Sequence, residues 1–149
     1  VRGVEKSNTK ICFVCLNRPY LDVVSELKDK KINTKKFFFI DTLSSHYMKP
    51  KPTANCIFVP GPHELGHIHV AINKAVREKR CSVVIFDTIS TLLIYQEVSS
   101  IVKFTHNILT DVENAKNIFI VLKSDGTIEK ERQELVKDLK MFADNTIEV

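Results

Sequence analysis

Val83-Val84-Ile85-Phe86 is the segment that most constrains the fold, because four consecutive apolar side chains leave neither face of a strand for solvent. A charged turn at 77–80 precedes this run, and Asp87 follows it. A run of this length between such boundaries fits a strand buried on both faces, as in a parallel sheet flanked by helices. The sequence therefore predicts a central strand that begins near Ser82 and ends at Asp87.

The rest of the chain alternates short apolar runs with amphipathic segments. Further strands are expected at 11–16, 36–41, 56–59, 117–122 and 145–149. Helices are expected at 19–30, 63–79 and 129–143, and over about twenty residues after Tyr95. Leu21 is expected on the buried face of the first helix, and Leu109 on that of the helix after Tyr95. This alternation predicts a parallel sheet covered by helices on both faces.

The composition is that of a folded α/β protein, with 44% apolar and 27% charged residues in a chain of 149. This length suits one domain, expected over 1–149, that buries its own core. The first residues are polar and no apolar run is long enough to span a membrane, so we expect no signal peptide, no membrane contact and a cytoplasmic location. Because the sequence begins with Val1, removal of an initiator methionine and a longer precursor both stay open.

Four cysteines, at 12, 15, 56 and 81, suggest a metal or redox site through Cys12-x-x-Cys15. Within a strand, side chains alternate between the two faces, so positions three apart point to opposite sides of the sheet. The sequence therefore favours reduced thiols packed in the core over a shared metal or disulfide.

The formal charge of +4 comes from basic residues that gather in two turns, at 28–36 and at 74–80. A nucleic-acid interface would require a denser basic stripe on one face, with exposed aromatic side chains between the charges. Lysines near helix C-termini also complement the helix dipole. We therefore interpret these turns as solvated helix ends and do not expect nucleic-acid binding.

Polar residues follow several of the expected strands. Asn17, Asp41, Asp87 and Ser124 stand at or just after the ends of their strands. The carboxyl ends of parallel strands meet at one edge of a sheet, where open α/β sheets place their ligands. Asp87 is the first candidate for chemistry, but an aspartate that ends a strand can also cap the next turn, and both interpretations stay open.

His63-Glu64-Leu65-Gly66-His67 matches H-E-x-x-H, in which two histidines bind zinc and the glutamate activates water. The context disfavours a zinc hydrolase. The segment Pro60-Gly61-Pro62 places His63 in the first turn of the expected helix, and no third histidine stands at the metzincin spacing. With Ile68 on the core face of that helix, His63 and His67 project toward solvent, where nothing excludes water.

Three segments stand out: Leu16-Asn17-Arg18-Pro19-Tyr20, Phe39-Ile40-Asp41-Thr42-Leu43-Ser44 and the run from Phe86 to Tyr95. Together they resemble archaeal RecA/KaiC-like proteins of largely unassigned function. The resemblance extends from about residue 11 to the end, and it implies a three-layer α/β/α RecA-like domain with a mainly parallel sheet. It also implies that Asp87 is the Walker B-like acid, which holds magnesium through water in working ATPases. Thr88 and Ser90 of the same motif join the candidate site.

The sequence departs from working RecA-like ATPases at two points. No G-x-x-x-x-G-K-[ST] motif occurs, so the backbone amides and the lysine that cradle phosphates are missing. The strand that ends in a catalytic glutamate in RecA and KaiC relatives is followed here by Asn17, and an amide cannot act as a general base. We assign no catalytic residue. Whether a longer precursor supplies the phosphate-loop strand upstream of Ile11, or the strand has been lost, stays open.

These observations favour a catalytically silent RecA/KaiC-like domain that acts as a binding or regulatory module. The alternative is an ATPase whose nucleotide site is completed by upstream sequence or by a neighbouring subunit. A zinc hydrolase that uses His63, Glu64 and His67 is the distant third hypothesis. We expect no cofactor beyond weakly bound magnesium-ATP, and either a protein partner or self-association.

Overall fold

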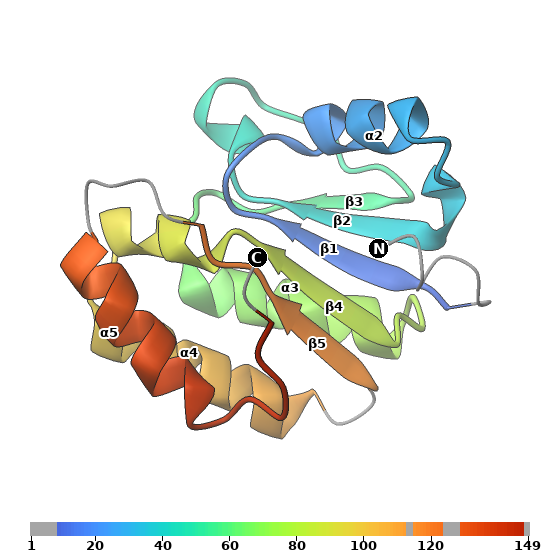
Figure 1. Ribbon diagram of the computed structural model, residues 1–149. Coiled ribbons are helices and arrows are strands. Elements are labelled where there is room, and N and C mark those ends of the chain that lie inside the picture. Colours follow the sequence, from blue (N-terminus) through green and yellow to red (C-terminus); the bar gives the residue numbers. More distant parts are fainter. Residues whose placement is uncertain (1–8, 113–114, 124–128, 148–149) are drawn as a thin grey trace.

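The structure is a computed structural model that describes residues 9–112, 115–123 and 129–147. Within these residues, five strands form a single parallel sheet (Figure 1). The strands are β1 (Ile11–Cys15), β2 (Phe37–Asp41), β3 (Cys56–Phe58), β4 (Val83–Asp87) and β5 (Asn117–Ile120). Every residue of β1, β2 and β4 is buried, which agrees with their uninterrupted apolar sequences.

The strand order is β3-β2-β1-β4-β5, so β1 occupies the middle of the sheet. The chain builds outward from β1 through β2 to β3, then crosses to the other side of β1 and adds β4 and β5. β4 is an interior strand, as its sequence predicts. The reversal of direction lies between β1 and β4, and in open α/β sheets the crevice at such a point is where ligands bind.

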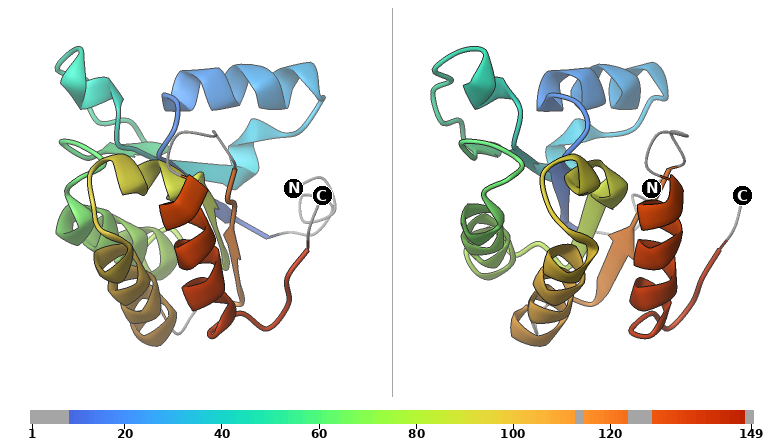
Figure 2. Two further views of the ribbon diagram at one scale, coloured as in Figure 1. Left: turned by 60° about the vertical axis from the view of Figure 1, so that its left-hand side comes forward. Right: turned by 90° about the vertical axis from the view of Figure 1, so that its left-hand side faces the viewer.

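Helices cover both faces of the sheet. Among the described residues the helices are α2 (Tyr20–Asp29), α3 (Leu65–Arg77), α4 (Val98–Asp111) and α5 (Glu129–Lys140), together with the short 3₁₀ helices η1 (Thr34–Lys36), η2 (Ser44–His46) and η3 (Ile89–Ile94). Figure 1 shows α2 on one side of the sheet and α3, α4 and α5 on the other, and both views in Figure 2 agree. The predicted three-layer α/β/α architecture is therefore confirmed. No helix in the described part of the chain has the length and apolar character needed to cross a membrane.

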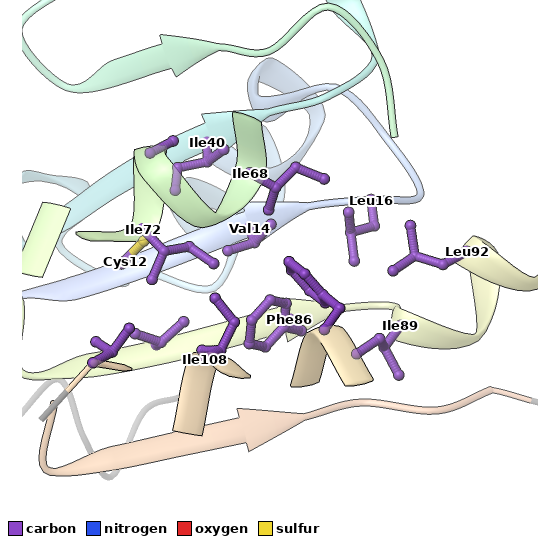
Figure 3. Close-up of a cluster of buried hydrophobic side chains, with 14 of the residues drawn as sticks. Cys12, Val14, Leu16, Ile40, Ile68, Ile72, Phe86, Ile89, Leu92 and Ile108 are labelled. Carbon is purple, nitrogen blue, oxygen red and sulfur yellow. The ribbon is translucent and has the colours of Figure 1, made fainter. Parts of the chain in front are cut away.

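Two clusters of apolar side chains hold the layers together, one on each face of the sheet. The larger cluster joins β1, β2 and β4 to α3, α4 and α5, and Figure 3 shows Ile68 and Ile72 of α3 directed toward the strands. The smaller cluster packs Val23 and Leu27 of α2 on the opposite face. Cys12 belongs to the larger cluster and Cys15 to the smaller one, so the expectation that these thiols point to opposite sides is confirmed.

Some elements differ from the sequence-based expectations. α3 begins at Leu65, which leaves His63 before the helix, and α4 has 14 residues where about twenty were expected. Leu21 is 62% exposed and Leu109 is 38% exposed, so both expected core positions are wrong. The physical reason is geometric: each helix buries a narrower stripe than its apolar sequence allows, and the outer apolar residues lie beyond that stripe.

The C-terminal part of the sheet also differs. β5 was expected to be fully buried, but its residues alternate between exposed and half-buried because it is the outermost of the described strands. The expected final strand at 145–149 is not formed at 145–147, which carry no regular structure, and residues 148–149 lie outside the described residues.

Candidate functional site

The carboxyl ends of β1 and β4 lie side by side at the point where the strand order reverses. Cys15, the last residue of β1, is in register with Asp87 of β4 on one side and with Asp41 of β2 on the other. The amide of Leu16 donates a hydrogen bond to the carbonyl of Asp87 at 2.9 Å, which fixes the start of the loop after β1. The loop residues Asn17 and Arg18 are thereby positioned next to the end of β4.

Asp87 is the centre of the charged groups at this edge. Its side chain is only 7% exposed, and Thr88 Oγ1 donates a hydrogen bond of 2.6 Å to its Oδ1. Two cations stand beside the carboxylate: Lys123 Nζ lies 3.7 Å from Oδ1, and Arg18 Nη2 lies 3.8 Å from Oδ2. A carboxylate with so little solvent requires nearby positive charge or hydrogen-bond donors, and here the chain supplies both.

The Arg18 guanidinium is shared between two acids. It also forms an ion pair with Glu26 of α2, which in turn pairs with Lys30 at 2.9 Å. The hydrogen bonds from Lys30 and Arg18 lower the pKa of Glu26. Arg18 thus links Glu26 of α2 to the end of β4 while remaining 33% exposed.

Ser90 joins the end of β5 to η3 at the same edge. Its hydroxyl lies 3.2 Å from both the carbonyl oxygen and the amide nitrogen of Lys123. The amide of Ile89 donates to the carbonyl of Val121 at 2.9 Å. These bonds hold the backbone of Lys123 beside η3. From this position the Lys123 side chain extends to Asp87.

Asp41 has a different environment from Asp87. It is fully buried and accepts hydrogen bonds from the amides of Tyr20, Leu43 and Ser44 and from the hydroxyl of Ser44, at 2.7–2.9 Å. These donors belong to the turn that follows β2 or to the first residue of α2. The side chain therefore acts as an anchor for the polypeptide around it, as a capping aspartate does.

The remaining predicted site residues lie at the rim or outside the described residues. Asn17 is exposed in the loop that follows β1. Ser124 lies outside the described residues. The structure thus brings Asp87, Thr88 and Ser90 together at the end of β4 and leaves Asn17 at the surface. Asp41 lies at the end of β2, which is separated from β4 by β1.

The thiol of Cys15 lies between the two aspartates on the face covered by α2. Burial raises the pKa of this thiol well above its usual value, and the carboxylate of Asp41 and, to a smaller degree, that of Asp87 raise it further. The neutral thiol is therefore the favoured form, which makes Cys15 a packing residue and a poor nucleophile.

The H-E-x-x-H segment does not form a metal centre in this structure. Glu64 is the N-cap of α3 and lies 3.5 Å from His63 Nε2 and 3.2 Å from His67 Nδ1, with all three side chains more than a third exposed. His63 was expected in the first turn of the helix and instead precedes it, packed over Gly61. Among the residues described, no group of three or more His, Cys, Asp or Glu side chains could hold a metal ion, so the zinc hypothesis has no support.

Two residues of this site were missed by the sequence analysis. Arg18 and Lys123 both stand within three residues after the end of a strand, which is a signal that could have been used. Their partnership with Asp87, however, depends on the order of the strands, because β1 and β5 flank β4. We refer below to Arg18, Asp87, Thr88 and Lys123 as the switch-point cluster.

Comparison with known proteins identifies the fold. No protein-family model matches the sequence, and no curated protein sequence is similar to it. Among solved structures, the fold is similar to that of a KaiC-like protein from the hyperthermophilic archaeon Pyrococcus horikoshii OT3, with a TM-score of 0.59 and 13% sequence identity. The match covers 90% of this chain and 59% of that protein.

This similarity shows the class of protein to which the fold belongs: the chain has a KaiC-like, RecA-like α/β fold with a parallel sheet. The chain spans 59% of the length of the KaiC-like protein that it matches. At 13% identity the likeness concerns the fold alone. What the site does is therefore argued from its own residues.

Proposed function

We propose that this chain is a catalytically silent RecA/KaiC-like domain that acts as a binding or regulatory module, through a protein partner or self-association. The observation that carries the proposal is the environment of Asp87, the Walker B-like acid by resemblance. Its carboxylate already has Arg18 and Lys123 within 4 Å and the Thr88 hydroxyl at 2.6 Å.

The cations beside Asp87 favour a structural role for this carboxylate over a magnesium site. A metal-binding aspartate needs oxygen atoms that face the ion, and a dication placed next to Arg18 and Lys123 would be repelled by both. The printed sequence also has no phosphate-loop motif, so the amides and the lysine that support tight triphosphate binding are not supplied by these residues.

A second candidate is an ATPase whose nucleotide site is completed by other sequence or by a neighbouring subunit. The exposure of the two cations favours it, since Arg18 is 33% exposed and Lys123 is 60% exposed at the carboxyl edge. Cations in such a position can contact phosphate oxygens of a ligand from solvent. The first proposal expects no ATP hydrolysis, whereas the second expects hydrolysis that requires Asp87.

The test is a phosphate-release assay together with calorimetry of magnesium-ATP binding, on the unmodified chain and on Asp87→Asn. We expect no hydrolysis above background and an affinity no tighter than about millimolar, equivalent to roughly 4 kcal/mol. Asp29→Asn is the matched control, because Asp29 is an exposed aspartate at the far end of α2. Circular dichroism establishes that both variants fold.

Hydrolysis by the unmodified chain that is lost in Asp87→Asn and kept in Asp29→Asn would reject the silent-domain proposal in favour of the second candidate. Micromolar binding of magnesium-ATP without hydrolysis would contradict the expected weak affinity, but it would agree with a domain that does not hydrolyse ATP.

A further inference from the structure

Lysines from three segments that are far apart in sequence meet at the amino edge of the sheet. Lys35 and Lys36 of η1 precede β2, Lys79 follows α3, and Lys10 precedes β1. Together they border a hollow of about 110 Å³. Its lining is Lys10, Lys35, Lys36, Phe37, Phe38, Ala54, Asn55, Lys79 and Cys81, and we call it the amino-edge hollow.

The floor of the amino-edge hollow is apolar. Phe37 and Phe38 of β2 and Cys81, two residues before β4, are all buried. Lys79 Nζ lies 5.6 Å from the centroid of the Phe38 ring, so the ring face holds this ammonium group near the hollow. A positive charge is thus positioned over an apolar wall, where it is screened less than a fully solvated charge.

Four of the nine residues that line this hollow are lysines. Among the described residues that line it, none is acidic. None of the ion pairs between described residues involves Lys10, Lys35 or Lys79. Ammonium groups gathered without a carboxylate repel one another, and a bound anion would relieve that repulsion.

We propose that the amino-edge hollow binds the phosphate group of a small molecule. The volume of about 110 Å³ is well below the roughly 300 Å³ at which pockets begin to enclose whole drug-sized ligands, so it suits a compact anion. Lysine ammonium groups and the Asn55 amide supply hydrogen-bond donors for phosphate oxygens. The hollow is at the edge of the sheet opposite to the switch-point cluster, so this proposal does not depend on the function proposed above.

The first experiment is an NMR titration of the ¹⁵N-labelled protein at constant ionic strength. Inorganic phosphate, adenosine monophosphate and adenosine are added separately, with sodium chloride as the reference. We expect shifts of amide signals around Lys35, Asn55 and Lys79 with both phosphate compounds and none there with adenosine. Equal affinities of the two phosphate compounds indicate that free phosphate suffices, and tighter binding of the monophosphate indicates that an attached organic group contributes.

Two double variants that change the net charge equally distinguish a specific phosphate site from general electrostatic attraction. Lys35→Gln with Lys79→Gln should weaken phosphate binding by at least about tenfold, which corresponds to about 1.4 kcal/mol. The control pair is Lys103→Gln with Lys137→Gln, which removes two exposed lysines from α4 and α5 and changes the net charge equally. The single variant Lys35→Gln changes an exposed side chain and should weaken binding measurably by itself, so the test stands if the double variant does not fold.

Several results would overturn the proposal. Equal weakening by the two pairs of variants would mean attraction by net charge alone. If no amide signal shifts at phosphate concentrations up to about 10 mM, the hollow has no phosphate site of useful affinity. A dissociation constant above this concentration corresponds to a binding free energy below roughly 3 kcal/mol. Binding of a single-stranded oligonucleotide far more tightly than either phosphate compound, with shifts well beyond the hollow, would replace the small-molecule ligand with a nucleic acid.

Discussion

At the scale of single residues, the two strand-end aspartates show how neighbours decide the role of a side chain. Asp41 and Asp87 are the last residues of two apolar strands, β2 and β4, and are in register with the same residue, Cys15. Backbone amides and a serine hydroxyl surround Asp41, whereas cationic side chains surround Asp87. Asp41 is an anchor for the local backbone, whereas the two cations beside Asp87 have side chains that are 33% and 60% exposed.

The buried cysteines predict a loss of stability in alkali. Burial raises the pKa of Cys81 to about 11, from the usual thiol value of 9.0 that applies in the unfolded chain. Between these values the unfolded chain loses a proton that the folded chain keeps, so the free energy of unfolding falls as the pH rises. We expect Cys81 to account for a fall of roughly 1 kcal/mol by about pH 10.

Urea unfolding of the unmodified chain and of Cys81→Ala, at several pH values from 8 to 10, measures this effect. The variant should start from a lower stability and lose less of it across the range. Parallel pH profiles for the two proteins would show that ionisation of this thiol makes no contribution.

At the scale of elements, Asp41 connects the end of β2 with the start of α2 and with η2. Its carboxylate accepts the amide of Tyr20, which is the first residue of α2, and the amides of Leu43 and Ser44 around the start of η2. Pro19 at the N-cap of α2 has no side-chain hydrogen bond to offer, so Asp41 supplies the cap from a different strand.

Replacement of Asp41 by alanine should lower the free energy of unfolding by roughly 3 kcal/mol, because three backbone amides lose their acceptor. Ser44→Ala is the matched control, since it removes one hydroxyl donor and leaves the amides satisfied. This control should cost about 1 kcal/mol, and chemical denaturation measures both. A loss of similar size in the two variants would contradict the capping role.

The sequence predicted most elements because their patterns are local. The buried runs of β1, β2 and β4 and the core face of α3 at Ile68, Ile72 and Val76 follow directly from apolar spacing. β5 was misjudged because exposure of a strand depends on whether another strand lies beside it. That information is in the order of the sheet and not in the residues of the strand.

At the scale of the whole molecule, charged residues from separate segments form two distinct surfaces at opposite edges of the sheet. The switch-point cluster at the carboxyl edge contains paired charges of both signs. The lining of the amino-edge hollow contains four lysines and, among the described residues, no acidic side chain. The sequence showed the basic turns as separate helix ends, because only the pairing of β1 with β2 and β4 brings Lys10, Lys35 and Lys79 together.

This distribution of charge predicts weak, salt-sensitive association with nucleic acid. The exposed aromatic side chains Tyr47, Tyr95 and Phe119 come from different elements, and none of them lines the basic hollow. Binding measured by fluorescence anisotropy at about 50 mM salt should therefore be weak and should disappear by about 200 mM. Sub-micromolar, sequence-dependent binding that persists at about 200 mM salt would refute this expectation.

The strand order also has a consequence for the protein as it is synthesised. Ile11 of β1 is in register with Phe37 and with Val83, so β1 has one partner that follows soon and another that is translated 72 residues later. A nascent chain of which residue 80 has left the ribosome, but β4 has not, therefore presents one open, apolar edge of β1. Such an edge can pair with another chain on the same polysome. Slow translation at that stage would lengthen the time during which the ribosome-bound chain needs a chaperone.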